Sequence, residues 1–164
     1  MKLPQTPPLH DLLELTDPAN PEVPQHLLFH VEEELYALSL REVSELARLE
    51  RLMPVPGLPP HFIGVINLRG NVVPIMDLQL RFGLAATPPQ PKSLILICRI
   101  DDTLTGLLVN SITKVATIQS EAYGPNHPRF SAGEKVSGVA TCDDALVAIL
   151  NLEAVIDLPK TPPT

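Results

Sequence analysis

The residue types that carry out chemistry in proteins are sparse in this chain of 164 residues, and they do not converge. Its five histidines are scattered between the N-terminal segment, one β-prone run and two loops, which gives a zinc site little support. The adjacent carboxylates of Asp101-Asp102 and Asp143-Asp144 each fall where a hairpin must turn, a position that suits aspartate. Neither a Gly-rich phosphate loop nor a GxSxG nucleophile motif occurs. We therefore expect no catalytic residues, no metal and no cofactor, and a surface that binds other proteins.

Charge and composition narrow the class of partner further. The net charge of −7 at pH 7 disfavours nucleic acid, because basic side chains supply most of the affinity for phosphates. Cys98 and Cys142 lie in separate apolar runs outside any CxxC motif, as expected of reduced thiols in or near a core. The first residues lack the apolar centre of a signal peptide, and no apolar run approaches the ~18 residues of a membrane span. We expect a cytoplasmic protein without direct membrane insertion.

Short β-prone runs separated by turn residues predict a mainly β protein. Residues 27–40 indicate one hairpin, whereas residues 41–49 are either a helical turn or a strand that begins at Val43. A second hairpin turns at Arg69-Gly70-Asn71, because glycine and asparagine tolerate a positive φ. Pro74 lacks an amide hydrogen, which predicts an edge or a bulge on that side of its strand.

The second half of the chain follows similar rules. Strands are predicted at 93–100 and 103–109, a closing hairpin at 136–150, and helical turns at 78–82 and 151–157. Residues 121–135 are expected to form a polar loop.

The chain ends are rich in proline and are expected to be tails. Residues 1–25 contain the apolar run Leu9–Leu15, which is either part of a mobile tail or a short helix that docks on the module or on a partner. Residues 159–164 form the other tail. The remaining 26–158 make one domain, with a first barrel over roughly 26–88 and a second over roughly 92–158.

A weak internal repeat supports this division. Residues 64–78 align with 138–152 at an offset of 74, and residues 37–43 align with 106–112 at an offset of 69. The repeat predicts two similar small β-barrels with a seam between them, and such a seam is a natural binding groove. Only the first hairpin carries an arginine and a glycine at its turn, so we expect that hairpin to be specialised for a partner.

The segment Gly64–Leu78, with its Asn67-Leu68-Arg69-Gly70 turn and Pro74-Ile75-Met76-Asp77-Leu78 strand end, resembles the CheW family of bacterial chemotaxis adaptors. The resemblance covers about residues 26–158. It implies two intertwined five-stranded SH3-like β-barrels with short helical turns. It also implies two partners, the regulatory domain of a CheA-type histidine kinase and the cytoplasmic tip of a chemoreceptor.

The resemblance further implies partner-binding positions, which are Val43, Glu45, Gly64, Arg69, Gly70 and Val115. Glu45 and Arg69 either pair and shape a groove or contact the receptor directly. Val43 and Val115 either offer apolar contacts or only pack, and the two glycines either bind or only satisfy backbone geometry. One departure is Asn110, which stands where the family usually has aspartate and so removes a charge.

The function implied is a non-catalytic adaptor that couples a chemoreceptor to a CheA-type kinase. The alternative is the same module in a non-flagellar chemosensory system that controls pili, surface motility or gene expression. A small hydrolase or ligand-binding barrel would require a pocket with two convergent titratable groups, which the sequence does not indicate.

Overall fold

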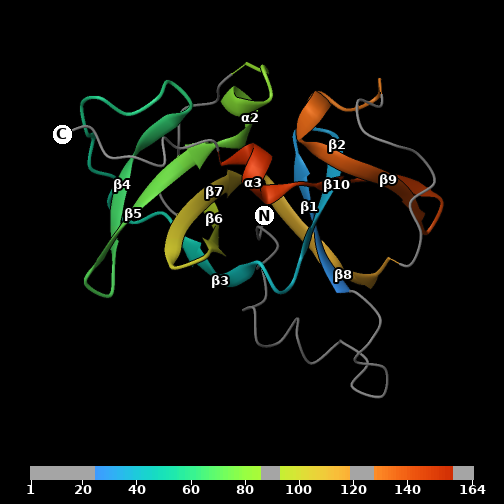
Figure 1. Ribbon diagram of the computed structural model, residues 1–164, viewed down its shortest axis with the longest axis horizontal. Coiled ribbons are helices and arrows are strands. Elements are labelled where there is room, and N and C mark those ends of the chain that lie inside the picture. The colour runs from blue at the N-terminus through green and yellow to red at the C-terminus, as the bar shows by residue number, and fades with distance from the viewer. Residues whose placement is uncertain (1–24, 86–92, 119–127, 157–164) are drawn as a thin grey trace, which may run out of the picture.

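The computed structural model describes residues 25–85, 93–118 and 128–156, which form two five-stranded sheets (Figure 1). Sheet A has the order β8-β1-β2-β10-β9, and sheet B has the order β3-β6-β7-β5-β4. The strands of sheet A are β1 (Gln25–Val31), β2 (Glu34–Ser39), β8 (Ser111–Thr117), β9 (Val136–Cys142) and β10 (Ala145–Leu150). Those of sheet B are β3 (Val43–Arg48), β4 (Phe62–Leu68), β5 (Asn71–Asp77), β6 (Leu94–Ile100) and β7 (Thr103–Val109). The mainly β fold is confirmed.

The predicted hairpins turn at residues whose φ is positive. Arg69 and Gly70 have φ values of 52° and 87°, and Asp143 and Asp144 have 50° and 67°. These left-handed conformations match the twist of two-residue hairpins, and aspartate and glycine adopt them at low cost. Asp101, at the β6–β7 turn, has a φ of 53°, so the acidic pairs are turn residues.

Two short helices follow the long hairpins and are capped alike. Asp77 caps α2 (Leu78–Arg81), where its Oδ1 accepts a hydrogen bond from the amide of Gln79 at 2.9 Å. Asn151 caps α3 (Leu152–Val155) in the same way through its own Oδ1. Both predicted helical turns are confirmed, and a 3-10 turn, η1 (Gly133–Lys135), precedes β9.

The internal repeat is present in the order of the elements. β1 and β6 share their bounds at an offset of 69, and α2 and α3 share theirs at an offset of 74. Their sheet positions also correspond, because β8, β1, β2, β10 and β9 take the places of β3, β6, β7, β5 and β4. The first hairpin of each repeat therefore pairs in the sheet of the other repeat, through the parallel contacts β2–β10 and β7–β5. Sheet membership cuts across a division into residues 26–88 and 92–158.

Three findings refine the strand predictions. Of the two alternatives for residues 41–49, the strand that begins at Val43 is confirmed as β3, and β8 is a strand that the sequence did not predict. Pro74 lies in an interior strand, but the ladder between β5 and β7 begins only at Ile75, so the missing amide hydrogen falls outside that ladder. A bulge also interrupts the β4–β5 pairing between Phe62 and Gly64.

The largest buried cluster joins the two sheets. It includes Leu27, Tyr36 and Val139 from sheet A and Met76, Leu96 and Leu107 from sheet B, all fully buried. A separate cluster around Ile66, Ile75 and Ile95 fills sheet B, and another around Leu28, Ala37 and Val147 fills sheet A. The core is therefore divided into three clusters, one of which is shared by the two sheets.

Hydrogen bonds also join elements that pack on the cluster shared by the two sheets. Arg81, on α2, donates from Nε to the Val155 carbonyl at 2.9 Å and from Nη2 to the Ala154 carbonyl at 3.0 Å, at the end of α3. Glu34 accepts hydrogen bonds from the Tyr36 hydroxyl and from the amide and hydroxyl of Ser131. These bonds fix the segment before η1 against β2.

Candidate partner-binding groove

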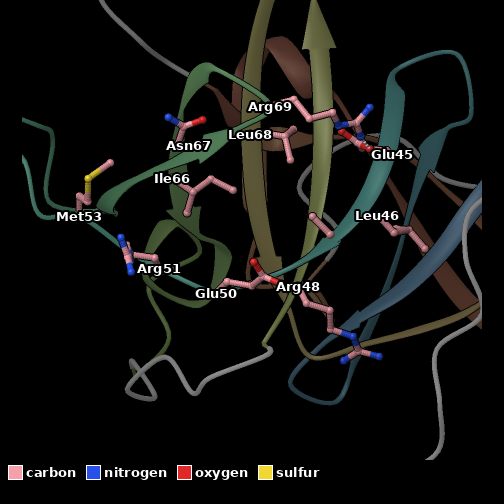
Figure 2. A pocket seen from close by; sticks show the side chains of 11 residues that line it. Glu45, Leu46, Arg48, Glu50, Arg51, Met53, Ile66, Asn67, Leu68 and Arg69 are labelled. Atoms are coloured by element: carbon pink, nitrogen blue, oxygen red, sulfur yellow. Dashed lines mark hydrogen bonds and ion pairs between the residues drawn. The ribbon is translucent and has the colours of Figure 1, made fainter.

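A groove of about 550 Å³ lies in sheet B between its two edge strands. One wall is β3 with the residues that follow it, and the other is the end of β4 with its turn (Figure 2). The lining residues are Glu45, Leu46, Ala47, Arg48, Glu50, Arg51, Met53, Ile66, Asn67, Leu68 and Arg69. Because β3 and β4 are first and last in the sheet order, the sheet curls until its edges face each other, as in a barrel that stays open along one seam.

A contact closes each end of this groove. At one end the Arg69 guanidinium forms an ion pair with the Glu45 carboxylate, which Figure 2 shows spanning from the β4–β5 turn to β3. At the other end Met53 and Val65 exchange two backbone hydrogen bonds of 2.8 Å. The predicted pairing of Glu45 with Arg69 is thus present in the structure, and it shapes the groove.

The groove has an apolar floor and a charged rim. Ile66 and Leu68 point into the space between the strands, and with Ala47 they belong to or pack on the buried cluster of sheet B. The Arg69 side chain is 73% exposed and that of Glu45 is 27% exposed. An ion pair this exposed contributes little to folding, typically 0–1 kcal/mol, and so remains available to a partner.

Gly64 lies under the end of the groove that Met53 closes. It is buried, its φ is 149°, and a Cβ at this position would lie 2.6 Å from the carbonyl oxygen of Met53. The Met53–Val65 bridge therefore requires glycine here, because any side chain would displace Met53 and the backbone around it. This geometry explains Gly64 through the wall of the groove that it permits.

Gly70 is exposed, and its neighbourhood differs from that of Gly64. Its amide donates to Asn67 Oδ1 at 2.8 Å, and a Cβ would meet no atom within 4 Å. Its φ of 87° is the only feature that favours glycine. Gly70 therefore holds the turn that places Arg69 opposite β3.

The two predicted valines do not line the groove. Val43 is 7% exposed and belongs to the cluster shared by the sheets. Val115 lies on β8 in sheet A, opposite Leu27, and packs on the same cluster while staying partly buried. The structure thus brings Glu45 and Arg69 together, with Gly70 next to Arg69 in the chain and Gly64 at the opposite end of the groove, whereas the valines pack on the cluster that the two sheets share.

Sequence reasoning missed most of the groove walls. Arg48, Glu50 and Arg51 lie at the end of β3 and just beyond it, and Met53 follows in the proline-rich loop. The signal that could have found them is topological, because the groove exists only where the two edge strands of a curled sheet approach. Nothing in the local pattern of these residues marks them.

Sheet A has an equivalent ion pair between its edge strands, with the acidic and basic residues exchanged. Lys114 on β8 forms an ion pair with Asp143 at the β9–β10 turn. Lys114 occupies the repeat position of Glu45, at an offset of 69, and Asp143 occupies that of Arg69, at an offset of 74. Both sheets therefore tie their edge strands by a charged contact, and the acidic and basic partners are exchanged.

The described residues contain no group of three or more histidine, cysteine, aspartate or glutamate side chains that could hold a metal ion. His26 and His30 are four residues apart, a spacing that on a helix would place both imidazoles on one face. They lie on β1, where four residues span about 13 Å. Among the described segments, no helix is long and apolar enough to cross a membrane.

Known proteins with similar sequence and structure share one family. Residues 25–160 match the CheW-like domain. The chemotaxis protein CheW of Helicobacter pylori is 30% identical over 138 residues, which cover 84% of each chain. That of Bacillus subtilis is 27% identical over 133 residues, covering 80% of this chain and 85% of the relative. The crystal structure of the scaffolding protein TtCheW from Thermoanaerobacter tengcongensis matches with a TM-score of 0.74 and 28% identity, covering 85% of this chain and 96% of that one.

Proposed function

The chain belongs to the CheW-like family and is a chemotaxis adaptor, and we propose that it couples a chemoreceptor to the regulatory domain of a CheA-type histidine kinase. The family is non-catalytic, so the coupling rests on binding surfaces alone. We place the protein in the cytoplasm, recruited to receptor arrays through these contacts. The alternative role in a non-flagellar system is not favoured, because the relatives above are chemotaxis proteins.

The observation that carries this proposal is the groove closed by Glu45 and Arg69. Its apolar floor, formed by Ile66 and Leu68, can bury side chains of a partner, and its charged rim can exchange the internal ion pair for an intermolecular one. Interfaces commonly combine an apolar centre with such a polar rim, and arginine is frequent among the residues that dominate affinity. We assign Glu45 and Arg69 to direct partner contact.

The other predicted positions support that contact in different ways. Gly70 sets the turn from which Arg69 projects, and Gly64 permits the Met53–Val65 bridge at the far end. Val115 is proposed to form an apolar contact with a partner through its partly exposed side chain, whereas the buried Val43 is proposed to act only through packing. The six residues would then serve two neighbouring contacts, and not one.

The proposal is tested by measuring binding to a CheA-type kinase regulatory domain and, separately, to a receptor cytoplasmic fragment. We expect Glu45→Ala and Arg69→Ala each to weaken binding to one of these partners by about 5- to 30-fold, equivalent to about 1–2 kcal/mol. Lys114→Ala is the matched control, because it removes the equivalent ion pair from sheet A. Its affinity for the partner affected by Arg69→Ala should stay within about twofold of the unmodified protein.

Two results would contradict the proposal. If the protein binds neither partner at tens of micromolar, the proposed coupling role is refuted. Unchanged affinities in both groove variants, with the unmodified protein binding normally, would leave the function intact but place the contact elsewhere.

A further inference from the structure

Arg69 occupies a backbone position that does not suit its residue type. Its φ of 52° is left-handed, a conformation in which the Cβ of an ordinary residue is crowded by its own backbone. Glycine, asparagine and aspartate adopt this conformation most readily. The other non-glycine residues with a positive φ in the described parts of the chain are all acidic, namely Glu32, Asp101, Asp143 and Asp144. Arginine is therefore a costly choice for this turn, and neighbouring groups must hold its conformation.

The neighbour that holds the turn is Asn67, near the end of β4, where it also lines the groove (Figure 2). Leu68 pairs with Asn71, so the turn consists of Arg69 and Gly70 alone. The Gly70 amide donates a hydrogen bond to Asn67 Oδ1 at 2.8 Å, and the Asn67 side chain thus spans the residue between them. Because an amide hydrogen requires an acceptor oxygen, this bond also fixes the orientation of the Asn67 amide group.

The equivalent turn of sheet A has different residues at the corresponding positions. At an offset of 74, Thr141 replaces Asn67 and Asp144 replaces Gly70. Both residues of that turn are aspartates, which adopt left-handed conformations readily and so need less support. The asparagine thus occurs in the hairpin whose turn carries the strained arginine.

The Glu45–Arg69 ion pair depends on the direction in which the arginine leaves its turn. The guanidinium reaches from the β4–β5 turn to β3, as Figure 2 shows. The Arg69 side chain is 73% exposed, so packing does little to hold it. A small rotation of the backbone at the turn would move the end of such a long side chain away from β3. A residue that fixes this backbone therefore also fixes the position of a charge on the groove rim.

We propose that Asn67 is a positioning residue, which holds the Arg69-Gly70 turn in its left-handed conformation and so keeps the Arg69 guanidinium opposite Glu45. In the adaptor role, a consequence that rests on the proposed function, Asn67 presents a preformed arginine to the partner. Less side-chain entropy is then lost on binding. Asn67 acts on the partner only through Arg69.

The motion of the Arg69 side chain tests the proposal without any partner. The heteronuclear NOE of its Nε–Hε group reports motion on the picosecond to nanosecond timescale, and Glu45→Ala provides the reference for a released arginine. We expect Asn67→Ala to lower the NOE from the unmodified value to this reference. Asn67→Asp and Asn67→Ser keep an oxygen that can accept from the Gly70 amide and should restore the NOE. The serine variant is decisive, because it adds no charge that could itself hold the arginine. Thr141→Ala is the matched control and should leave the NOE unchanged.

Binding measurements test whether the effect passes through Arg69. For the partner whose affinity falls in Arg69→Ala, we expect Asn67→Ala to weaken binding by about 3- to 10-fold. In an Arg69→Ala background the same substitution should change affinity by less than about twofold, because residues that act as one unit are not additive. Its urea midpoint should fall in both backgrounds, so a general loss of stability cannot produce this difference. All measurements use the full chain, including the run Leu9–Leu15, which lies outside the described residues.

Three results would overturn the proposal. The NOE of Arg69 could stay unchanged in Asn67→Ala, it could already be as low in the unmodified protein as in Glu45→Ala, or Asn67→Ala could weaken binding equally with and without the Arg69 side chain. If the unmodified protein binds neither partner, the proposed function fails, whereas the NOE comparison still decides the role of Asn67. The two failures are therefore distinguishable.

Discussion

Replacing Gly64 with alanine tests the central geometric claim about the groove. A Cβ there would lie 2.6 Å from the Met53 carbonyl oxygen, and the backbone has a φ of 149°, a conformation that side chains rarely adopt. Such backbone strain costs about 1–3 kcal/mol. Displacing Met53 also disrupts its two hydrogen bonds to Val65, which at the lower end of the usual range contribute about 1 kcal/mol together. We expect Gly64→Ala to lower the free energy of unfolding by about 2–4 kcal/mol.

The assay is urea denaturation, with Gly70→Ala as the matched control. With an m-value of about 2 kcal/mol/M, the expected loss in Gly64→Ala lowers the midpoint by about 1–2 M. Gly70 also has a positive φ, of 87°, but a Cβ there would meet no atom within 4 Å. Its substitution should therefore cost only the conformational part, about 1–2 kcal/mol. Equal losses in the two variants would refute the claim that close approach to Met53 requires Gly64.

Substitutions at three further positions test the polar framework. Asp77→Asn should keep or raise stability at pH 7, because Asn151 caps α3 in the same way, whereas Asp77→Ala should cost about 1 kcal/mol by thermal denaturation. Burial raises the pKa of Asp77, so the unmodified protein should lose stability as pH rises from the unfolded towards the folded pKa, and Asp77→Asn should lack this loss. Tyr36→Phe should cost about 1–2 kcal/mol in urea denaturation, because its hydroxyl donates to the Glu34 carboxylate. Arg81→Met should cost about 1–3 kcal/mol in the same assay, since it leaves two carbonyl oxygens of α3 without their donor; no loss would mean that water replaces the guanidinium.

The elements that the sequence predicted are those whose signal is local. The Arg69-Gly70 and Asp143-Asp144 turns can be predicted from their residue types. The strands beside them either alternate apolar and polar residues or are continuous apolar runs. β8 was missed because its burial pattern, with mostly half-buried and exposed residues, gives a weak period-two signal. Residues 41–49 were ambiguous because their apolar spacing suits a helical turn as well as the strand that forms. Pairing with β6 decides between them, and that contact is not local.

The groove was predictable only in part, for the same reason. Glu45 and Arg69 were identified through family resemblance, and their pairing follows from a contact across 24 residues of sequence. Arg48, Arg51 and Met53 carry no motif, and their place in the site depends on how far sheet B curls. Sequence spacing specified which strands exist, whereas the approach of two sheet edges specified which side chains share a site.

The exchange of hairpins between the two repeats bears on how such an adaptor can present two different surfaces. Each sheet takes one hairpin from the other half of the chain, and the largest core cluster draws on both sheets, so neither half has a complete core of its own. Each sheet nevertheless has its own edge seam, by which we mean the line where its two edge strands approach, and one ion pair joins the strands there. Because the acidic residue lies on β3 in sheet B but at the β9–β10 turn in sheet A, a partner surface complementary to one seam meets like charges at the other. Like-charge juxtaposition across an interface costs several kcal/mol, enough to direct two partners to two seams of one rigid fold.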